Sequence, residues 1–186
     1  MEHMNATSFY NLLLEDLGFE AKVKQDIALQ KLSTFVVEGS KDDLFLLKGF
    51  AGTGKTTIIS SLVKNLWKMK KNGVLLAPTG RAAKVISNYS GREAFTIHKK
   101  IYFPKAKGGG GVTFTLQPNK HRNTIFIVDE ASMISDVNAE AKMFENGSLL
   151  DDLMQYVYSG HNCQLILMGD TAQLPPVKLD VSPALE

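Results

Sequence analysis

Two short stretches of this sequence combine residue types that bind phosphate and metal ions. Residues 49–57 read GFAGTGKTT and lie between the apolar run LFLLK and the segment IISSLVKNLWKMK. They fit the pattern G-x-x-x-x-G-K-[ST]. Glycines let backbone N–H groups approach phosphate oxygens, and the N-terminus of a following helix adds positive charge. The stretch predicts a phosphate-binding loop in which Lys55 reaches the β- and γ-phosphates of a nucleotide and the Thr56 hydroxyl ligates Mg²⁺.

The second stretch, IFIVDEAS, supplies the acids that such a site needs. Asp129 ends an apolar run and Glu130 follows it. We expect Asp129 to hold Mg²⁺ and Glu130 to orient and deprotonate the attacking water. This pair favours nucleotide hydrolysis, because a nucleotide kinase has no need of a water-activating glutamate. The sequence has no N-K-x-D pattern for reading guanine.

A third polar group follows the last apolar run, in the segment MGDTAQLPPV. Gln173 lies there in a loop stiffened by Pro175 and Pro176. Strand ends converge on the ligand in open parallel sheets. We therefore predict that Gln173 senses the γ-phosphate.

The elements that must position these groups alternate along the chain. Four apolar runs predict buried strands over 44–48, 73–78, 124–129 and 163–170. Helical spacing predicts helices over 6–17, 22–37, 55–70, 80–88 and 148–160, the first capped by Ser8. Ile58, Leu62 and Trp67 are expected on one side of the third helix. Apolar strands alternating with helices predict an α/β fold, a P-loop NTPase with a parallel sheet covered by helices on both faces.

One segment interrupts this alternation. Residues 102–123 show no helical period, contain four successive glycines at 108–111, and include the alternating run VTFTL. We predict a small inserted β-hairpin with a glycine-rich tip. Phe103 and Phe114 in this insertion are candidates for stacking on a ligand, although packing within the hairpin would also explain them.

Composition indicates an ordinary globular protein. The chain has 186 residues, 44% of them hydrophobic and 22% charged. No apolar run approaches 18 residues, so we expect no membrane segment. The N-terminal stretch lacks the basic start of a signal peptide. The one cysteine, Cys163, lies in an apolar run as a small buried side chain, which suits the reducing cytoplasm.

The net charge of +2 hides an uneven distribution. Residues 80–123 carry nine basic side chains and one acidic side chain, whereas residues 124–186 carry two basic and ten acidic. A basic segment of this kind is typical of a protein that follows a polyanion such as nucleic acid. When charge is considered alone, a solvated surface face is the favoured explanation of the imbalance.

Taken together, these motifs resemble superfamily 1 DNA helicases of the RecD and Dda type, specifically their first RecA-like motor domain. The resemblance is collinear over residues 22–177. The matching segments are QDIAL at 25–29, GFAGTGKTT at 49–57, LLAPTGRAAKVI at 75–86, TIHKKIY at 96–102, IVDEASMIS at 127–135 and LILMGDTAQLPPV at 165–177.

The resemblance implies roles for further residues. Gln25 would contact adenine, and Asp170 with Gln173 would couple the γ-phosphate to the nucleic-acid site. Other residues would hold phosphates and metal: Gly52, Thr53, Gly54, Lys55, Thr56 and Thr57. A third set would lie along a track for single-stranded DNA: Thr79, Gly80, Arg81, Thr96 and His98. The cofactors would be ATP and Mg²⁺, and the motor would move 5′-to-3′, usually as a monomer.

The resemblance also implies a domain organisation. We expect an N-terminal helical segment at 1–21, an ATPase domain at 22–101 and 124–186, and an inserted hairpin at 102–123 that separates strands. The sequence ends soon after the last matching motif. We therefore expect a partner in a second RecA-like domain that carries an arginine finger, and slow hydrolysis without it.

Two other classes of function stay open at this point. One is a P-loop ATPase that regulates a partner and does not move on nucleic acid. The other is a nucleic-acid-binding module whose nucleotide site is vestigial. Salt-sensitive binding to single strands distinguishes the first from a helicase, and nucleotide binding distinguishes the second.

Overall fold

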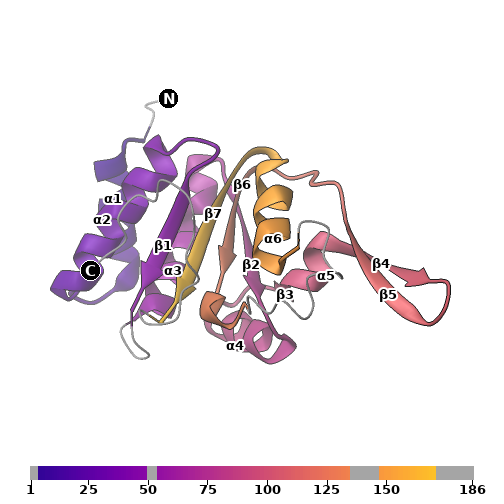
Figure 1. Cartoon of the computed structure of the whole chain (residues 1–186). Helices are drawn as coiled ribbons and strands as arrows, with labels where there is room; N and C mark the ends of the chain where they lie inside the picture. The colour runs from indigo at the N-terminus through magenta and orange to yellow at the C-terminus, as the bar shows by residue number, and fades with distance from the viewer. Residues whose placement is uncertain (1–3, 50–53, 135–146, 171–186) are drawn as a thin grey trace.

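A five-stranded parallel sheet organises the protein. The computed structural model describes residues 4–49, 54–134 and 147–170 (Figure 1). The strands are β1 (Leu44–Lys48), β2 (Asn72–Ala77), β3 (Ala94–Thr96), β6 (Arg122–Val128) and β7 (His161–Gly169). Their order in the sheet is β1-β7-β6-β2-β3, and every neighbouring pair is parallel. The strand that precedes the phosphate loop is therefore separated by β7 from the strand that precedes Asp129.

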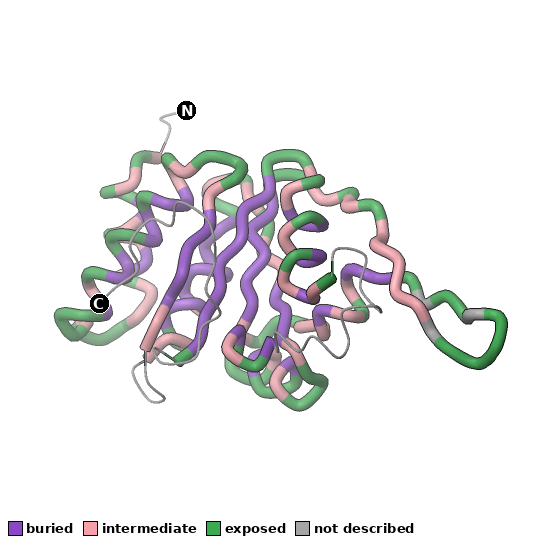
Figure 2. The backbone as a smooth tube through the Cα atoms, viewed as in Figure 1, coloured by how far each residue is buried: buried purple, intermediate pink, exposed green. Residues whose placement is uncertain are grey.

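Helices cover both faces of this sheet. On one face lie α1 (Ala6–Leu17), α2 (Val23–Glu38), α3 (Lys55–Asn65) and α4 (Gly80–Ser90), and on the other lie α5 (Ile97–Ile101) and α6 (Leu149–Tyr158). Strand β1 shows the division, because Phe45 and Leu47 pack with the first group while Leu44 and Leu46 pack with the second. The central strands are buried over most of their length (Figure 2). The predicted α/β sheet with two covered faces is confirmed.

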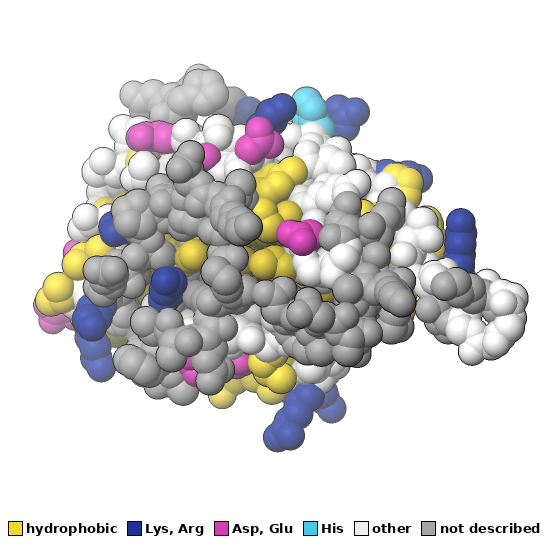
Figure 3. Space-filling view, in the orientation of Figure 1, with side chains coloured by type: hydrophobic (Ala, Val, Ile, Leu, Met, Phe, Trp, Pro, Cys, Tyr) yellow, Lys and Arg dark blue, Asp and Glu magenta, His cyan; other side chains and the backbone are white. Residues whose placement is uncertain are grey.

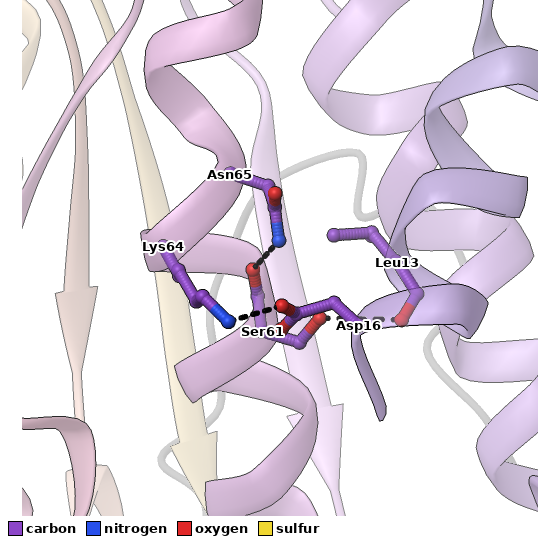
Figure 4. Close-up of polar contacts among 5 residues, drawn as sticks. All are labelled: Leu13, Asp16, Ser61, Lys64 and Asn65. Atoms are coloured by element: carbon purple, nitrogen blue, oxygen red, sulfur yellow. Dashed lines mark hydrogen bonds and ion pairs between the residues drawn. The ribbon is translucent and has the colours of Figure 1, made fainter. Parts of the chain in front are cut away.

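Polar contacts join α1 to α3 on the same face of the sheet (Figure 4). The hydroxyl of Ser61 donates to the carbonyl of Leu13 at 3.3 Å, and Lys64 forms an ion pair with Asp16. The amide of Asn65 donates to the carbonyl of Ser61 at 2.8 Å. Burial raises the pKa of Asp16 but hydrogen bonds from Lys64 and Ser61 outweigh it, so the net pKa is lowered. The N-terminal helix is therefore docked through named contacts as well as through apolar packing.

The four predicted strands are confirmed to within two residues at each end. The structure adds β3 and α5, which the sequence did not indicate because each is too short to show a period. The predicted cap of α1 was wrong: Asn5 is the N-cap, and its side chain accepts from the backbone N–H of Ser8 at 2.8 Å. Ser8 occupies the third helical position, whose N–H the cap satisfies.

The predicted helix over 55–70 does not continue in one form. Helix α3 ends at Asn65, and a 3₁₀ turn, η1, follows over Leu66–Met69. A 3₁₀ turn has three residues per turn, so it rotates the side chains away from the α-helical register. Trp67, expected on the buried side, is 67% exposed as a result. Ile58 and Leu62 are buried as predicted.

The predicted hairpin is present as an antiparallel pair that projects from the sheet (Figure 1). Strands β4 (Tyr102–Lys107) and β5 (Gly111–Leu116) pair directly after α5. Gln117 fixes its root, because its backbone N–H donates to the carbonyl of Ile101 at 2.7 Å and its side chain donates to the carbonyl of Tyr102 at 2.6 Å. The division of the chain into domains at 21, 101 and 123 stays a prediction.

Two remaining expectations concern burial and the membrane. Cys163 is 1% exposed, as the apolar run around it predicted. Within the described ranges, the structure contains no helix whose length and apolar character would let it cross a bilayer.

Candidate active site

The predicted site residues gather at one edge of the sheet because all five strands run in the same direction. Gly49 follows β1, Thr79 lies two residues beyond β2, Thr96 ends β3, Asp129 follows β6, and Asp170 follows β7. The carboxyl ends of parallel strands are the usual place for a ligand in such folds. The sequence motifs thus share one edge, although they are up to 121 residues apart along the chain.

The phosphate loop is held at both of its described ends. Gly49 extends the pairing of β1 and β7, because its N–H donates to the carbonyl of Gly169 at 3.2 Å. Gly54 is the N-cap of α3, in a left-handed conformation with φ of +85°. Thr56 is half-buried and Thr57 exposed in the first turn of α3. Gly52 and Thr53 lie outside the described residues.

Lys55 lies between the loop and the last strand. Its ammonium donates a hydrogen bond to the carbonyl of Gly49, and its Nζ is 3.5 Å from Oδ1 of Asp170. The Lys55 side chain is mostly covered, while that of Asp170 is about half exposed. A lysine held in this way is pre-positioned at the start of a helix, where a phosphate also meets the helix N-terminus.

The charge of this lysine acts on both predicted acids. Asp129 is half-buried, and its Oδ1 accepts from the backbone N–H of Glu130 at 2.9 Å. Burial raises the pKa of Asp129, and the Glu130 N–H and the charge of Lys55 offset part of that effect. Burial, followed by the charges of Asp129 and Asp170, raises the pKa of Glu130. These mutual effects place Lys55 and the three carboxylates within electrostatic reach of one another.

Glu130 also has an unusual backbone. Its φ is +52° and its ψ is +37°, the left-handed region that a side chain with a Cβ disfavours. Such conformations cost roughly 1–3 kcal/mol and collect at functional sites. The turn leaves the Glu130 side chain exposed at the strand end, where a raised pKa makes it a better proton acceptor near neutral pH.

The donor chemistry of this edge fits Mg²⁺. Asp129 and Thr56 offer oxygen ligands, which Mg²⁺ prefers, and a cation would stabilise the half-buried carboxylate of Asp129. Within the described ranges, no group of three or more His, Cys, Asp or Glu side chains is arranged around a metal position. The protein would supply one or two ligands, and phosphate oxygens and water the others.

Gln25 lies against the phosphate loop. It is 9% exposed, and its Oε1 accepts from the backbone N–H of Lys22 at 3.0 Å at the start of α2. A Cβ built on Gly54 would lie 2.1 Å from Nε2 of Gln25. The structure therefore brings Gln25 to the predicted nucleotide site and gives Gly54 a second reason to lack a side chain.

The residues of the predicted DNA track lie at the other end of the same edge. Thr79 caps α4 and Thr96 caps α5, each hydroxyl accepting a backbone N–H at 3.2 Å, while Gly80 and Arg81 are exposed in the first turn of α4. His98 differs, because its ring packs against those of Tyr102 and Phe114 with centroids 5.7 and 5.3 Å away. Gln173 lies outside the described residues.

Sequence reasoning did not assign individual roles to the basic residues near this track. Lys and Arg side chains protrude along the lower edge of the molecule and beside the hairpin (Figure 3). The basic composition of residues 80–123 was the available signal, but composition does not say which side chains converge. Gln117, which anchors the hairpin root, left no recognisable pattern in the sequence.

Comparison with known proteins agrees with this site. Residues 33–179 match a family described as "AAA domain". The chain is 32% identical over 135 residues to the ATP-dependent DNA helicase dda of Enterobacteria phage T4, covering 71% of this chain and 28% of that protein. It is 33% identical over 135 residues to the ATP-dependent RecD2 DNA helicase of Deinococcus radiodurans, covering 72% and 16%.

A third relative is the Uncharacterized protein R530 of Acanthamoeba polyphaga mimivirus. It is 31% identical over 176 residues, covering 83% of this chain and 33% of that protein. The chain thus spans a third or less of the length of each of these relatives. The motifs, the parallel sheet and the family match agree, and the chain belongs to the AAA domain family as a motor domain of the superfamily 1 helicase type.

Proposed function

We propose that this chain is the ATP-binding motor domain of an ATP-dependent DNA helicase that moves 5′-to-3′ along single-stranded DNA. The observation that carries the proposal is the convergence of Lys55, Asp129, Glu130 and Asp170 at the edge that also holds Thr79 and Thr96. Nucleotide chemistry and a track for a strand would thereby share one edge of the sheet. Two relatives named as ATP-dependent DNA helicases support this proposal.

Each residue has a physical role in this proposal. Lys55 exchanges its contacts with Gly49 and Asp170 for phosphate oxygens. Asp129 and Thr56 would hold Mg²⁺, which would neutralise charge on the phosphates. Glu130 accepts the proton of the attacking water. Gln25 reads adenine from the start of α2, and Gln173 senses the γ-phosphate.

The sheet offers a short path from the nucleotide to the strand. The backbone N–H of Asp129 donates to the carbonyl of Leu76 in β2 at 2.9 Å, and Thr79 follows Leu76 by three residues. Ala77 in β2 pairs in turn with Thr96 in β3. Hydrogen-bonded backbone thus connects Asp129 to both track threonines, and we propose that it couples hydrolysis to the strand.

Translocation requires a second body that closes on the nucleotide. We propose a second RecA-like domain as that partner, with an arginine that faces the γ-phosphate. The 5′-to-3′ polarity and the monomeric state rest on the helicase resemblance. Each awaits a strand-displacement assay with tailed substrates and a measurement of molecular mass in solution.

Binding of a fluorescent ATP analogue to this chain tests the nucleotide half of the proposal. Lys55→Ala removes a charge-assisted bond to phosphate, so affinity should fall at least about tenfold. Lys68→Ala changes an exposed lysine in the 3₁₀ turn that follows the same helix and should bind like the wild type. Equal affinity in Lys55→Ala would contradict the phosphate-loop assignment, and no binding in any form would favour a vestigial nucleotide site.

A further inference from the structure

A groove at the root of the hairpin lies outside the nucleotide site. It has a volume of about 540 Å³ and lies between α5, the start of β4, the loop before β6, and Tyr156 on α6. Three lysines line it, Lys99, Lys100 and Lys120, and none of the nine described residues that line it is acidic. The groove is therefore concave, and its described lining carries positive charge without negative charge.

Two of these lysines are placed by an aromatic ring. Nζ of Lys99 and Nζ of Lys100 lie 5.8 and 5.0 Å from the centroid of the Phe95 ring. Burial lowers the pKa of Lys100, and the charge of Glu93 offsets only part of that effect. Burial and the charge of Lys100 also lower the pKa of His121 across the groove. The protein thus holds the Lys100 ammonium where water stabilises it poorly, and an anion in the groove would relieve that cost.

The groove also offers an aromatic face. Phe103 is 51% exposed, although it lies in a strand paired with Thr115. The other hairpin phenylalanine, Phe114, packs against Tyr102 with ring centroids 5.1 Å apart. Packing within the hairpin therefore accounts for Phe114 and leaves Phe103 unexplained. The bonds of Gln117 at the hairpin root hold the backbone that presents the Phe103 ring.

The groove extends away from the nucleotide edge. Its first lysine, Lys99, donates its backbone N–H to the hydroxyl of Thr96 on the predicted track. Its far end reaches His121, which precedes β6, whereas Asp129 follows that strand. At a rise of roughly 3.3 Å per residue, these two ends of β6 are about 26 Å apart. A chain that leaves the track at Thr96 would enter the groove without crossing the nucleotide site.

We propose that this groove, which we name the hairpin-root groove, binds a segment of single-stranded nucleic acid, with phosphates on Lys99, Lys100 and Lys120 and a base stacked on Phe103. The proposal rests on the proposed function, since it extends the path of the same strand. Cationic grooves with exposed aromatic rings are the usual means of holding single strands. A duplex is disfavoured because its bases are already stacked and cannot cover a protein ring.

Fluorescence anisotropy with a labelled oligothymidylate tests the stacking contact. Phe103→Ala should weaken binding by about fivefold or more, the range found for loss of one stacked base. Phe19→Ala is the matched control, because Phe19 is also 51% exposed but lies between α1 and α2. It should bind like the wild type. Binding of a fluorescent ATP analogue should be the same in all three proteins.

The salt dependence of the same assay tests the phosphate contacts. Losing two phosphate contacts in Lys99→Ala/Lys120→Ala should reduce the slope of log K against log salt by about 1.4. Lys68→Ala is the control, because Nζ of Lys68 lies over Trp67 at 5.7 Å in a similar arrangement on the opposite face of the sheet. Its slope should equal that of the wild type.

The outcomes separate this proposal from the proposed function. If the wild type binds the oligonucleotide and the groove variants bind equally well, the hairpin-root groove is refuted while the helicase proposal stands. If the wild type binds the ATP analogue but no oligonucleotide, the hairpin-root groove is refuted, and the helicase proposal is decided by DNA-stimulated ATP hydrolysis in the full-length protein. If Phe103→Ala weakens binding of a blunt duplex as much as that of the single strand, the assignment to a single strand is wrong.

Discussion

An added methyl group at Gly54 tests the geometry of the phosphate loop. Gly54 has φ of +85°, and a Cβ there would lie 2.1 Å from Nε2 of Gln25. That nitrogen is the far end of a flexible side chain, so it could move aside. However, Gln25 is buried and its Oε1 accepts from the N–H of Lys22. Gly54→Ala should therefore destabilise the folded protein in two ways, by straining the backbone at residue 54 and by breaking the hydrogen bond that caps α2.

The magnitude follows from these two contributions. A left-handed conformation costs a residue with a Cβ about 1–2 kcal/mol. Losing the cap bond costs about 0.5–1.5 kcal/mol more. Gly18→Ala is the matched control, because Gly18 has φ of +71° and nothing within 4 Å of its would-be Cβ. Replacing glycine by alanine affects the unfolded chain alike at both positions. Gly54→Ala should lower the free energy of unfolding by about 1 kcal/mol more than Gly18→Ala.

Urea denaturation and binding of a fluorescent ATP analogue measure the effect. Only Gly54→Ala should weaken nucleotide binding. If the nucleotide-bound loop carries about 1 kcal/mol of strain that dissociation of the nucleotide relieves, the affinity should fall by about fivefold or more. The double variant Gln25→Ala/Gly54→Ala removes the clash, so its destabilisation should be about 1 kcal/mol smaller than the sum of the two single effects. Strict additivity, or equal costs at Gly54 and Gly18, would refute the contact between Gln25 and the loop.

Two further predictions concern charged and buried groups. Burial raises the pKa of Asp129 from its ordinary 3.8, so the folded protein disfavours the carboxylate and loses stability as pH rises from 3.8 through the folded pKa. Asp129→Asn should therefore have a higher melting temperature than the wild type at pH 7 without nucleotide, and the two melting temperatures should converge near pH 3. The variant should also fail to hydrolyse ATP. Asp42→Asn is the exposed control, and a lower melting temperature for Asp129→Asn at pH 7 would contradict the reasoning. The Tyr102 hydroxyl donates to Oδ2 of the fully buried Asp152 at 2.5 Å. Tyr102→Phe should therefore lower the free energy of unfolding, measured by urea denaturation, by about 1.5–3 kcal/mol, whereas Tyr89→Phe, at a 71% exposed position, should leave it unchanged. Equal stability of both variants would show that the buried hydrogen bond contributes little.

The sequence predicted the sheet well because its strands are nearly continuous apolar runs. LFLLK became β1 with its bounds unchanged, and Pro78 lies just beyond β2 as expected. A buried parallel strand needs apolar side chains on both faces, which leaves a clear signal. The order of the strands was not predictable, since pairing between β1 and β7 joins segments about 120 residues apart.

Local detail was predicted less well where two capping or helical forms compete. Asn5 and Ser8 are both good caps, and only the structure shows which one accepts the helix N–H. Trp67 continued the apolar spacing of α3, yet the change to a 3₁₀ turn exposed it. Periodicity reports the preferred face of a regular helix and does not reveal where the helix changes form.

The candidate site shows the same division between local and distant information. Lys55, Asp129 and Glu130 were predicted as site residues from short motifs, because each motif carries its own strand or helix end. The contact of Gln25 with Gly54 and the assembly of the hairpin-root groove join residues far apart in the chain. No local pattern encodes such meetings. The left-handed turn at Glu130 was equally unforeseen, since non-glycine residues rarely adopt it.

ATP hydrolysis by the full-length protein, measured with and without single-stranded DNA, tests the central claim most directly. If the nucleotide site and the track are coupled through β2 and β3, single strands should stimulate hydrolysis strongly, and Glu130→Gln should abolish the stimulated rate while keeping nucleotide binding. A rate that single-stranded DNA leaves unchanged, in a protein that still loses activity with Glu130→Gln, would contradict the claim and identify an ATPase that does not move on nucleic acid.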